Sequence, residues 1–94
     1  MSNKQTPANF HYLFPELTLK QYSALEMFSY GSQPKQVASQ MSISQETVKQ
    51  HMTAVKNKLD CRTTTDLRYV FITRIMSTIA MKSSNNQVVN IIQT

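Results

Sequence analysis

Apolar side chains recur at helical spacing in four stretches of the chain, and cap residues or turn formers separate these stretches. The first stretch begins at Thr18, whose hydroxyl can accept a hydrogen bond from the first turn while Gln21 reciprocates. Tyr22 and Leu25 share one face, and Gly31 can end the helix by taking a positive φ angle. The pattern therefore predicts a first helix between Thr18 and Gly31.

A short helix and a longer helix follow, joined by a tight connection. Pro34 suits the first position of a helix because an N–H there would have no partner in any case, and the pattern then continues to Met41. Ser42-Ile43-Ser44 forms the connection, and Ser44 caps a third helix that runs to about Leu59. The third helix carries one apolar stripe, made of Val48, Met52, Val55 and Leu59.

The fourth helix starts within Thr63–Asp66 and is expected from about 65 to 82. It has two apolar faces, so it needs two packing partners. One face comprises Leu67, Val70, Phe71, Ile75 and Thr78, and the other comprises Tyr69, Ile72, Met76 and Ile79. The core of so small a domain can cover only one face, and a second copy of the chain is the simplest cover for the other. We assign the dimer interface to Leu67, Val70, Phe71, Arg74, Ile75 and Thr78.

The two ends of the chain lie outside this pattern. Met1–Asn9 is polar and predicts a loose arm. The aromatic cluster Phe10–Pro15 either covers an edge of the core or contacts a second subunit or another protein. After a Ser- and Asn-rich linker, Val88, Val89, Ile91 and Ile92 have strand propensity without an evident strand partner. We expect an all-α protein with an N-terminal arm (1–16), a four-helix domain (17–82) and a flexible C-terminal tail (83–94).

Composition narrows the function classes. The chain has 94 residues, a formal net charge of +5 and a single cysteine, Cys61. A basic surplus on so short a chain favours a polyanionic partner, with nucleic acid ahead of an anionic membrane surface. A single glycine and the lack of a long apolar run argue against a phosphate loop and a transmembrane helix. Because no apolar leader precedes Phe10, we expect a cytoplasmic protein. If the polyanionic partner is DNA, the protein would associate with the nucleoid when bound.

The second and third helices form a helix-turn-helix arrangement, in which the second helix of the pair enters the major groove of DNA. The solvent face of the third helix is polar and basic, and no acidic residue occurs between Thr47 and Leu59. An ordinary solvated helix face would look similar. The side chains on this face are Gln45, Lys49, Gln50, Thr53, Lys56 and Asn57, with Lys58 near its end.

Leu17 to Leu67 resembles the LuxR/GerE-type helix-turn-helix domain of bacterial transcription regulators. The resemblance rests on Lys35-Gln36-Val37-Ala38, Met41-Ser42-Ile43-Ser44, Thr47-Val48-Lys49-Gln50-His51 and Lys58-Leu59, at ungapped spacing. It implies base contacts by Lys49, Gln50 and Thr53, and dimerisation through the fourth helix. It also implies phosphate contacts by Lys35, Thr47, His51, Lys56 and Lys58.

No enzyme, metal or cofactor is expected. His51 and His11 stand apart from any cluster of cysteines or carboxylates at ligand spacing, and Cys61 is interpreted as a buried thiol. We expect a stand-alone, dimeric, sequence-specific regulator that binds double-stranded DNA at a two-fold-related site. The alternative is an interaction module that pairs, through its fourth helix, with a larger regulatory protein.

Overall fold

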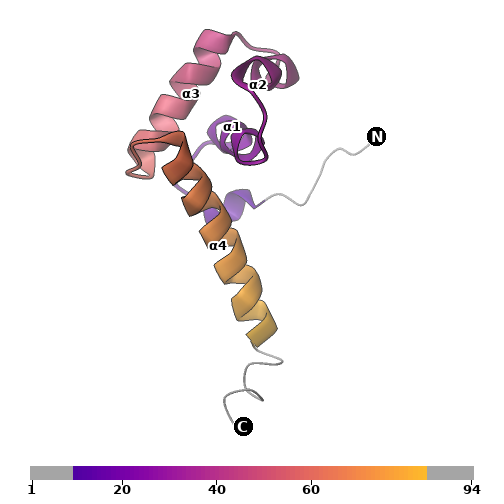
Figure 1. Ribbon diagram of the computed structural model, residues 1–94, viewed down its shortest axis with the longest axis vertical. Helices are drawn as coiled ribbons and strands as arrows, with labels where there is room; N and C mark the ends of the chain where they lie inside the picture. The colour runs from indigo at the N-terminus through magenta and orange to yellow at the C-terminus, as the bar shows by residue number, and fades with distance from the viewer. Residues whose placement is uncertain (1–9, 85–94) are drawn as a thin grey trace.

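The computed structural model describes residues 10–84, and all the regular secondary structure within them is helical, as predicted (Figure 1). A short 3-10 turn, η2, is followed by four α-helices. Their bounds are His11–Leu13 for η2, Leu19–Ser29 for α1, Pro34–Met41 for α2, Gln45–Lys58 for α3 and Thr64–Ser84 for α4. The expected arm at 1–9 and the tail segment at 85–94, including its β-branched residues, lie outside the described residues.

The predicted boundaries of α1 are confirmed by hydrogen bonds and backbone angles. The Thr18 hydroxyl accepts from the Gln21 amide at 3.1 Å, and the Thr18 amide donates to the Gln21 side chain at 3.0 Å. This reciprocal pair satisfies two backbone donors that the first turn leaves free. Gly31, two residues beyond the last residue of α1, has a φ of 99°, a conformation that side chains with a Cβ rarely adopt.

The core is built around α1, which packs against α2, α3 and α4. Three residues of α1 are buried, namely Tyr22, Ala24 and Leu25. The other helices contribute Val37 and Ala38 from α2, Val48, Met52 and Val55 from α3, and Leu67, Phe71 and Ile75 from α4. Because α3 and α4 both pack on α1, they are held in a fixed relation without extensive contact with each other.

The aromatic segment before α1 completes this core, as one of its two interpretations predicted. Phe14 is fully buried, and its ring centroid lies 5.6 Å from that of Phe71 and 5.7 Å from that of Tyr22. The Phe10 amide donates to the Tyr22 hydroxyl at 3.1 Å. Tyr12 stays 62% exposed. The segment therefore covers the edge of the core with Phe14 and leaves Tyr12 on the surface.

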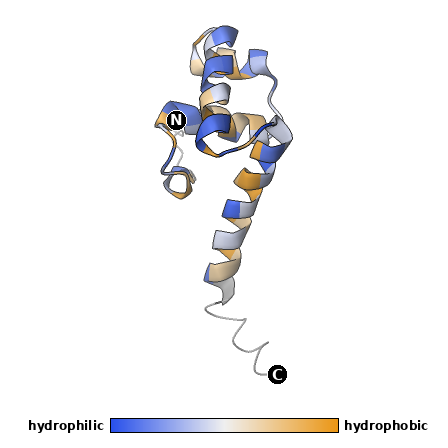
Figure 2. Cartoon of the chain, turned by 90° about the vertical axis from the view of Figure 1, so that its left-hand side faces the viewer, coloured by the Kyte–Doolittle hydropathy of each residue, from blue (hydrophilic) through white to orange (hydrophobic). Residues whose placement is uncertain are grey.

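The longest helix, α4, begins at a second reciprocal cap. The Thr63 hydroxyl accepts from the Asp66 amide at 3.0 Å, and the Asp66 carboxylate accepts from the Thr63 amide at 3.3 Å. Its 21 residues span about 30 Å, and its C-terminal half extends beyond the helical head (Figures 1 and 2). No helix in the described range 10–84 is both long and apolar enough to cross a lipid bilayer.

Candidate nucleic-acid interface

A three-residue turn sets the angle between α2 and α3. Ser42 has a φ of 58°, in the left-handed region, and the Ile43 amide donates to the Ala38 carbonyl at 3.0 Å. The Ser44 hydroxyl then accepts from the Thr47 amide at 3.0 Å, which caps the start of α3 as the sequence predicted. This turn is the connection of a helix-turn-helix pair.

The inner face of α3 fixes the rotation of the helix about its own axis. Val48, Met52 and Val55 are at most 7% exposed and belong to the common core. Leu59, the last residue of the predicted apolar stripe, is half-buried against the same core. Because this stripe is held by packing, the opposite face of α3 must point into solvent.

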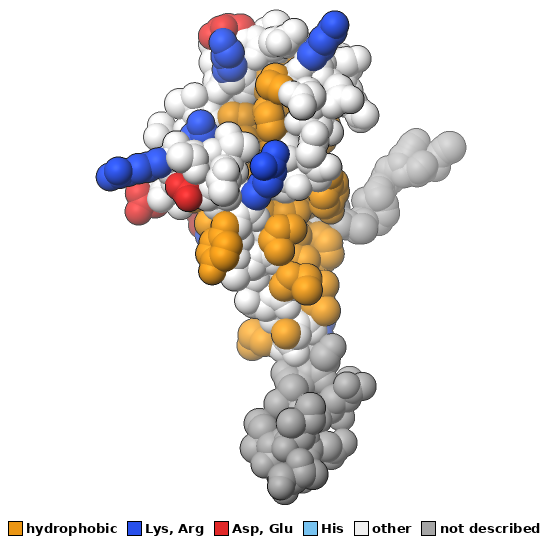
Figure 3. Space-filling view, viewed as in Figure 1, with side chains coloured by type: hydrophobic (Ala, Val, Ile, Leu, Met, Phe, Trp, Pro, Cys, Tyr) orange, Lys and Arg blue, Asp and Glu red, His pale blue; other side chains and the backbone are white. Residues whose placement is uncertain are grey.

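The outer face of α3 brings together the three residues expected to contact bases. Lys49, Gln50 and Thr53 are all exposed. They line one shallow surface depression, shared with Glu46, Ala54 and Asn57. In the face drawn in Figure 3, Lys and Arg side chains stand out over the helical head, whereas apolar side chains gather along α4. The depression offers donors and acceptors to a partner that approaches α3 from solvent.

The residues expected to contact phosphate do not form one cluster. Helical spacing places Thr47, His51 and Lys58 on one flank of the α3 face, and Lys56 on the other flank, seven residues after Lys49. The fifth residue, Lys35, is exposed in the first turn of α2.

Two of these side chains already have partners within the chain. The Thr47 hydroxyl lies 2.9 Å from the Ser44 hydroxyl, inside the cap of α3. The Lys58 ammonium donates to the Gln21 side chain at 2.9 Å. Lys58 therefore ties the end of α3 to the start of α1, a role that the sequence pattern did not indicate.

The structure places three residues of the predicted dimer face of α4 in the core of a single chain. Leu67, Phe71 and Ile75 are at most 8% exposed, so they belong to the core of one chain and cannot be offered to a second copy. Val70 and Thr78 are half-buried beside them. Both faces of α4 are apolar. The face that contains Phe71 is the buried one, because the Phe71 ring stacks on Phe14 in the core.

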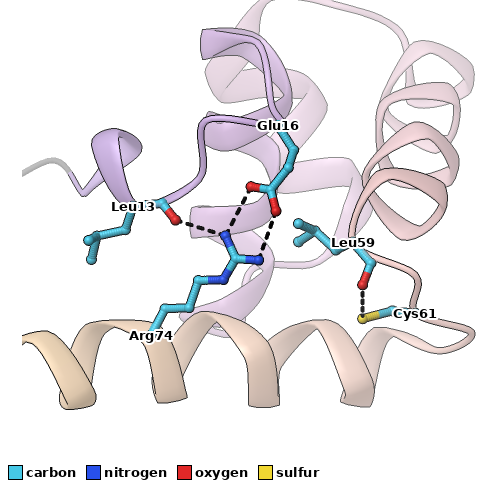
Figure 4. Close-up of polar contacts among 5 residues, drawn as sticks. All are labelled: Leu13, Glu16, Leu59, Cys61 and Arg74. Carbon is cyan, nitrogen blue, oxygen red and sulfur yellow. Dashed lines mark hydrogen bonds and ion pairs between the residues drawn. The ribbon is translucent and has the colours of Figure 1, made fainter.

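Arg74, also expected at the dimer interface, instead holds the segment before α1 (Figure 4). Its guanidinium donates to both oxygens of the Glu16 carboxylate, at 2.9 and 2.8 Å, and to the Leu13 carbonyl at 2.8 Å. It also lies 4.9 Å from the centroid of the Phe14 ring. The Arg74 hydrogen bond holds the pKa of the Glu16 carboxyl below its ordinary value.

The face of α4 that remains exposed is the second apolar face of the sequence pattern. Tyr69 is 72% exposed, Ile72 47%, Met76 57% and Ile79 46%. We refer to Tyr69, Ile72, Met76 and Ile79 as the outer face of α4. Their spacing of three, four and three residues forms one continuous stripe along the helix. Exposed apolar side chains gathered in this way are typical of a protein-interaction surface.

Cys61 was expected to be a buried thiol, but the structure shows it only half-buried. Its thiol lies 3.5 Å from the Leu59 carbonyl (Figure 4). Burial, reinforced by the carboxylates of Asp66 and Asp60, raises the pKa of the Cys61 thiol. A raised pKa disfavours the thiolate and so disfavours nucleophilic chemistry at this position.

Two acidic residues have positions in the structure that the sequence pattern did not indicate. Glu16 binds Arg74, which is 58 positions away, so no local pattern connects the two. In the sequence Glu46 is a first-turn acid that favours the start of α3. The structure also places it beside Lys49 and Gln50, which it precedes by three and four residues, around the same depression.

A comparison with models of protein families identifies a family that matches most of the described residues. The model described as bacterial regulatory proteins of the luxR family matches residues 15–71, which is more than half of the 94 residues. The match contains α1, α2, α3 and the start of α4, and it confirms the resemblance seen in the sequence. No curated protein and no solved structure matches the chain.

Proposed function

Because the chain belongs to the luxR family of bacterial regulatory proteins, whose domain is a DNA-binding helix-turn-helix, we propose that it is a sequence-specific regulator that binds DNA as a dimer. The observation that carries the proposal is the exposed, polar outer face of α3, which has Lys56 and Lys58 on its flanks. Lys49, Gln50 and Thr53 lie together on that face, and none of them is needed by the core.

These three side chains suit the major groove. Lysine donates to the O6 and N7 acceptors of guanine, and glutamine can make two hydrogen bonds to adenine. Threonine offers a hydroxyl for a base edge and a methyl group for the C5-methyl of thymine. We propose that Lys49, Gln50 and Thr53 contact bases, since the outer face of α3 presents them side by side.

The flanks of α3 suit the two phosphate backbones that border the groove. Thr47 and His51 lie on one flank, and Lys56 lies on the other. Lys35, at the start of α2, and Lys58 complete the proposed phosphate contacts. The Lys58 ammonium would keep or exchange its hydrogen bond to Gln21 when it meets a phosphate. Because these contacts neutralise phosphates, binding should weaken steeply as salt rises.

Dimerisation is proposed through the outer face of α4 and not through the buried face named from the sequence. The stripe from Tyr69 to Ile79 is exposed along its whole length. Two copies related by a two-fold axis would place two α3 helices in major grooves about one helical turn apart. The bound site is therefore expected to consist of two inverted half-sites.

The second candidate function is an interaction module that pairs with a larger regulator. It is favoured by the same outer face of α4, because an apolar stripe of this kind can pack against an unlike helix as well as against its copy. Under this alternative the pairing would modulate the partner, and DNA contact by α3 would be dispensable.

One titration separates the two functions. The whole chain is added to fluorescent random duplex at low salt, and the measurement is repeated at increasing salt. We expect binding at low salt and a linear fall of log affinity with log salt. Absence of binding at every salt concentration would favour the interaction module.

A further inference from the structure

Glu46 is the one carboxylate on the outer face of α3. It is exposed in the first turn of the helix and lines the same depression as Lys49, Gln50 and Thr53. The hydrogen bond of the Ser44 cap fixes the first turn of α3, so the position of Glu46 along the helix is also fixed. Within residues 10–84 the structure shows no hydrogen bond or ion pair that would hold the Glu46 carboxylate.

Stabilisation of the helix does not by itself account for this placement. A carboxylate anywhere in the first turn interacts favourably with the positive end of the helix dipole. Gln45 and Thr47 are also first-turn residues, but neither lines the depression that Glu46 shares with the expected base contacts. The position of Glu46 therefore places a negative charge on the surface proposed to face DNA.

The amino end of a recognition helix is the part that contacts base edges in helix-turn-helix complexes. An ionised carboxylate can only accept hydrogen bonds. Guanine and thymine present oxygen acceptors in the major groove, and adenine presents its N7 acceptor beside its N6 donor. Cytosine presents the N4 amino group as a donor, so it is the base edge that suits a carboxylate best.

We infer that Glu46 is a specificity-determining residue that accepts a hydrogen bond from the N4 amino group of a cytosine in each half-site. The inference rests on the proposed function, because it requires α3 to enter the major groove. The same charge also repels phosphates. Glu46 thus lowers affinity for unrelated sequences, where no cytosine donor compensates for the repulsion.

The experiment selects bound duplexes from a randomised library with the whole chain and three variants. Glu46→Ala removes the acceptor, and Glu46→Gln keeps the length of the side chain but adds a donor. Asp60→Asn is the matched control, because it makes the same charge change in the exposed turn after α3. Asp60 has a φ of 56°, a conformation that asparagine tolerates. Circular dichroism melts establish that the variants fold.

We expect the unmodified chain to enrich a cytosine at one position of each half-site, with a preference of about tenfold over other bases. Glu46→Ala should make that position degenerate, and Glu46→Gln should shift it toward adenine, which glutamine can bind with two hydrogen bonds. Both variants should bind random duplex more tightly than the unmodified chain. Asp60→Asn should enrich the same site as the unmodified chain.

Two results would overturn the inference, and they are distinguishable. If the unmodified chain enriches a defined site and the Glu46 variants enrich the same site, Glu46 only stabilises the start of α3, and the proposed function stands. If the unmodified chain enriches no sequence at all, the proposed sequence-specific function fails, and the role of Glu46 fails with it.

Discussion

The outer faces of α3 and α4 differ in chemistry although both helices pack on α1. Along α3 the exposed side chains are polar, and most of the charged ones are basic. Along α4 the exposed stripe is apolar, from Tyr69 to Ile79. Packing in the core requires apolar residues on the inner face of each helix. Information about a binding partner therefore comes from the residues of the outer face. A polar, basic face suits nucleic acid, and an apolar face suits another protein helix.

The largest expected effect sharpens the distinction between the two faces of α4. Phe71→Ala should lower the free energy of unfolding by about 4 kcal/mol, because Phe71 is a fully buried aromatic residue. Ile72→Ala, on the outer face, should cost less than about 1 kcal/mol. Urea unfolding is measured at protein concentrations low enough to keep the chain monomeric. Equal losses in the two variants would contradict the assignment of the core face.

A second test asks whether the outer face of α4 binds a copy of itself. The double variant Ile72→Asp, Met76→Asp should be monomeric by analytical ultracentrifugation, since burying two carboxylates in an apolar interface is costly. Binding to a two-half-site duplex should weaken about 100-fold, because the two half-sites no longer act together. Ser77→Asp is the control, because Ser77 is exposed on α4 but is not one of the four residues of the outer face. An unchanged dimer in the double variant would remove this face from the proposal.

A third test concerns the outer face of α3. Lys49→Ala should weaken binding to the selected site about tenfold and binding to random duplex much less, since a lost base contact matters only where the base is right. Lys82→Ala is the matched control, because it removes the same charge from the far end of α4. Fluorescence anisotropy at one fixed salt concentration measures both affinities. An equal loss on both duplexes would show that Lys49 contacts phosphate.

The smallest expected effect concerns the polar contact that ties α4 to the segment before α1. The hydrogen bond from Arg74 lowers the pKa of Glu16, so the folded state favours the ionised carboxylate. This stabilisation is present above the ordinary pKa of 4.5 and is lost as the pH falls through the lowered pKa. The side chains of Arg74 and Glu16 are 34% and 36% exposed, so solvent screening keeps the contribution small.

Glu16→Gln should therefore lower the free energy of unfolding by about 0.5 kcal/mol at neutral pH. The difference between the variant and the unmodified chain should shrink as the pH falls below 4.5. Urea unfolding at several pH values measures both. A difference that stays constant down to low pH would mean that Glu16 ionisation is not coupled to folding.

The helix boundaries could be predicted because their determinants are local. Thr18, Pro34 and Ser44 act on backbone groups within three residues of themselves, and the structure places a helix start beside each. Gly31 has the positive φ that its position after α1 required. The residues exposed on α3 could also be predicted from a local pattern. The helix has one apolar stripe, and burying that stripe leaves only one way to orient the helix.

The face of α4 could not be predicted, because the choice depends on residues far away in the chain. Both faces are apolar at helical spacing, so periodicity alone does not separate them. The choice is made by Phe14, which stacks on Phe71, and by Glu16, which binds Arg74. Contacts across 57 or 58 positions leave no local pattern that a reader of the sequence could use.

Because α3 and α4 both pack on α1, the buried side chains of α1 would influence the geometry of the proposed dimer on DNA. If α4 forms the dimer interface around the two-fold axis and α3 enters the groove, the packing of α1 determines the distance of each α3 helix from that axis. Repacking Leu25 or Ala24 with a larger residue would then alter the preferred number of base pairs between half-sites without touching a single DNA contact. The preferred number of base pairs between half-sites would thus depend on how the hydrophobic core is packed.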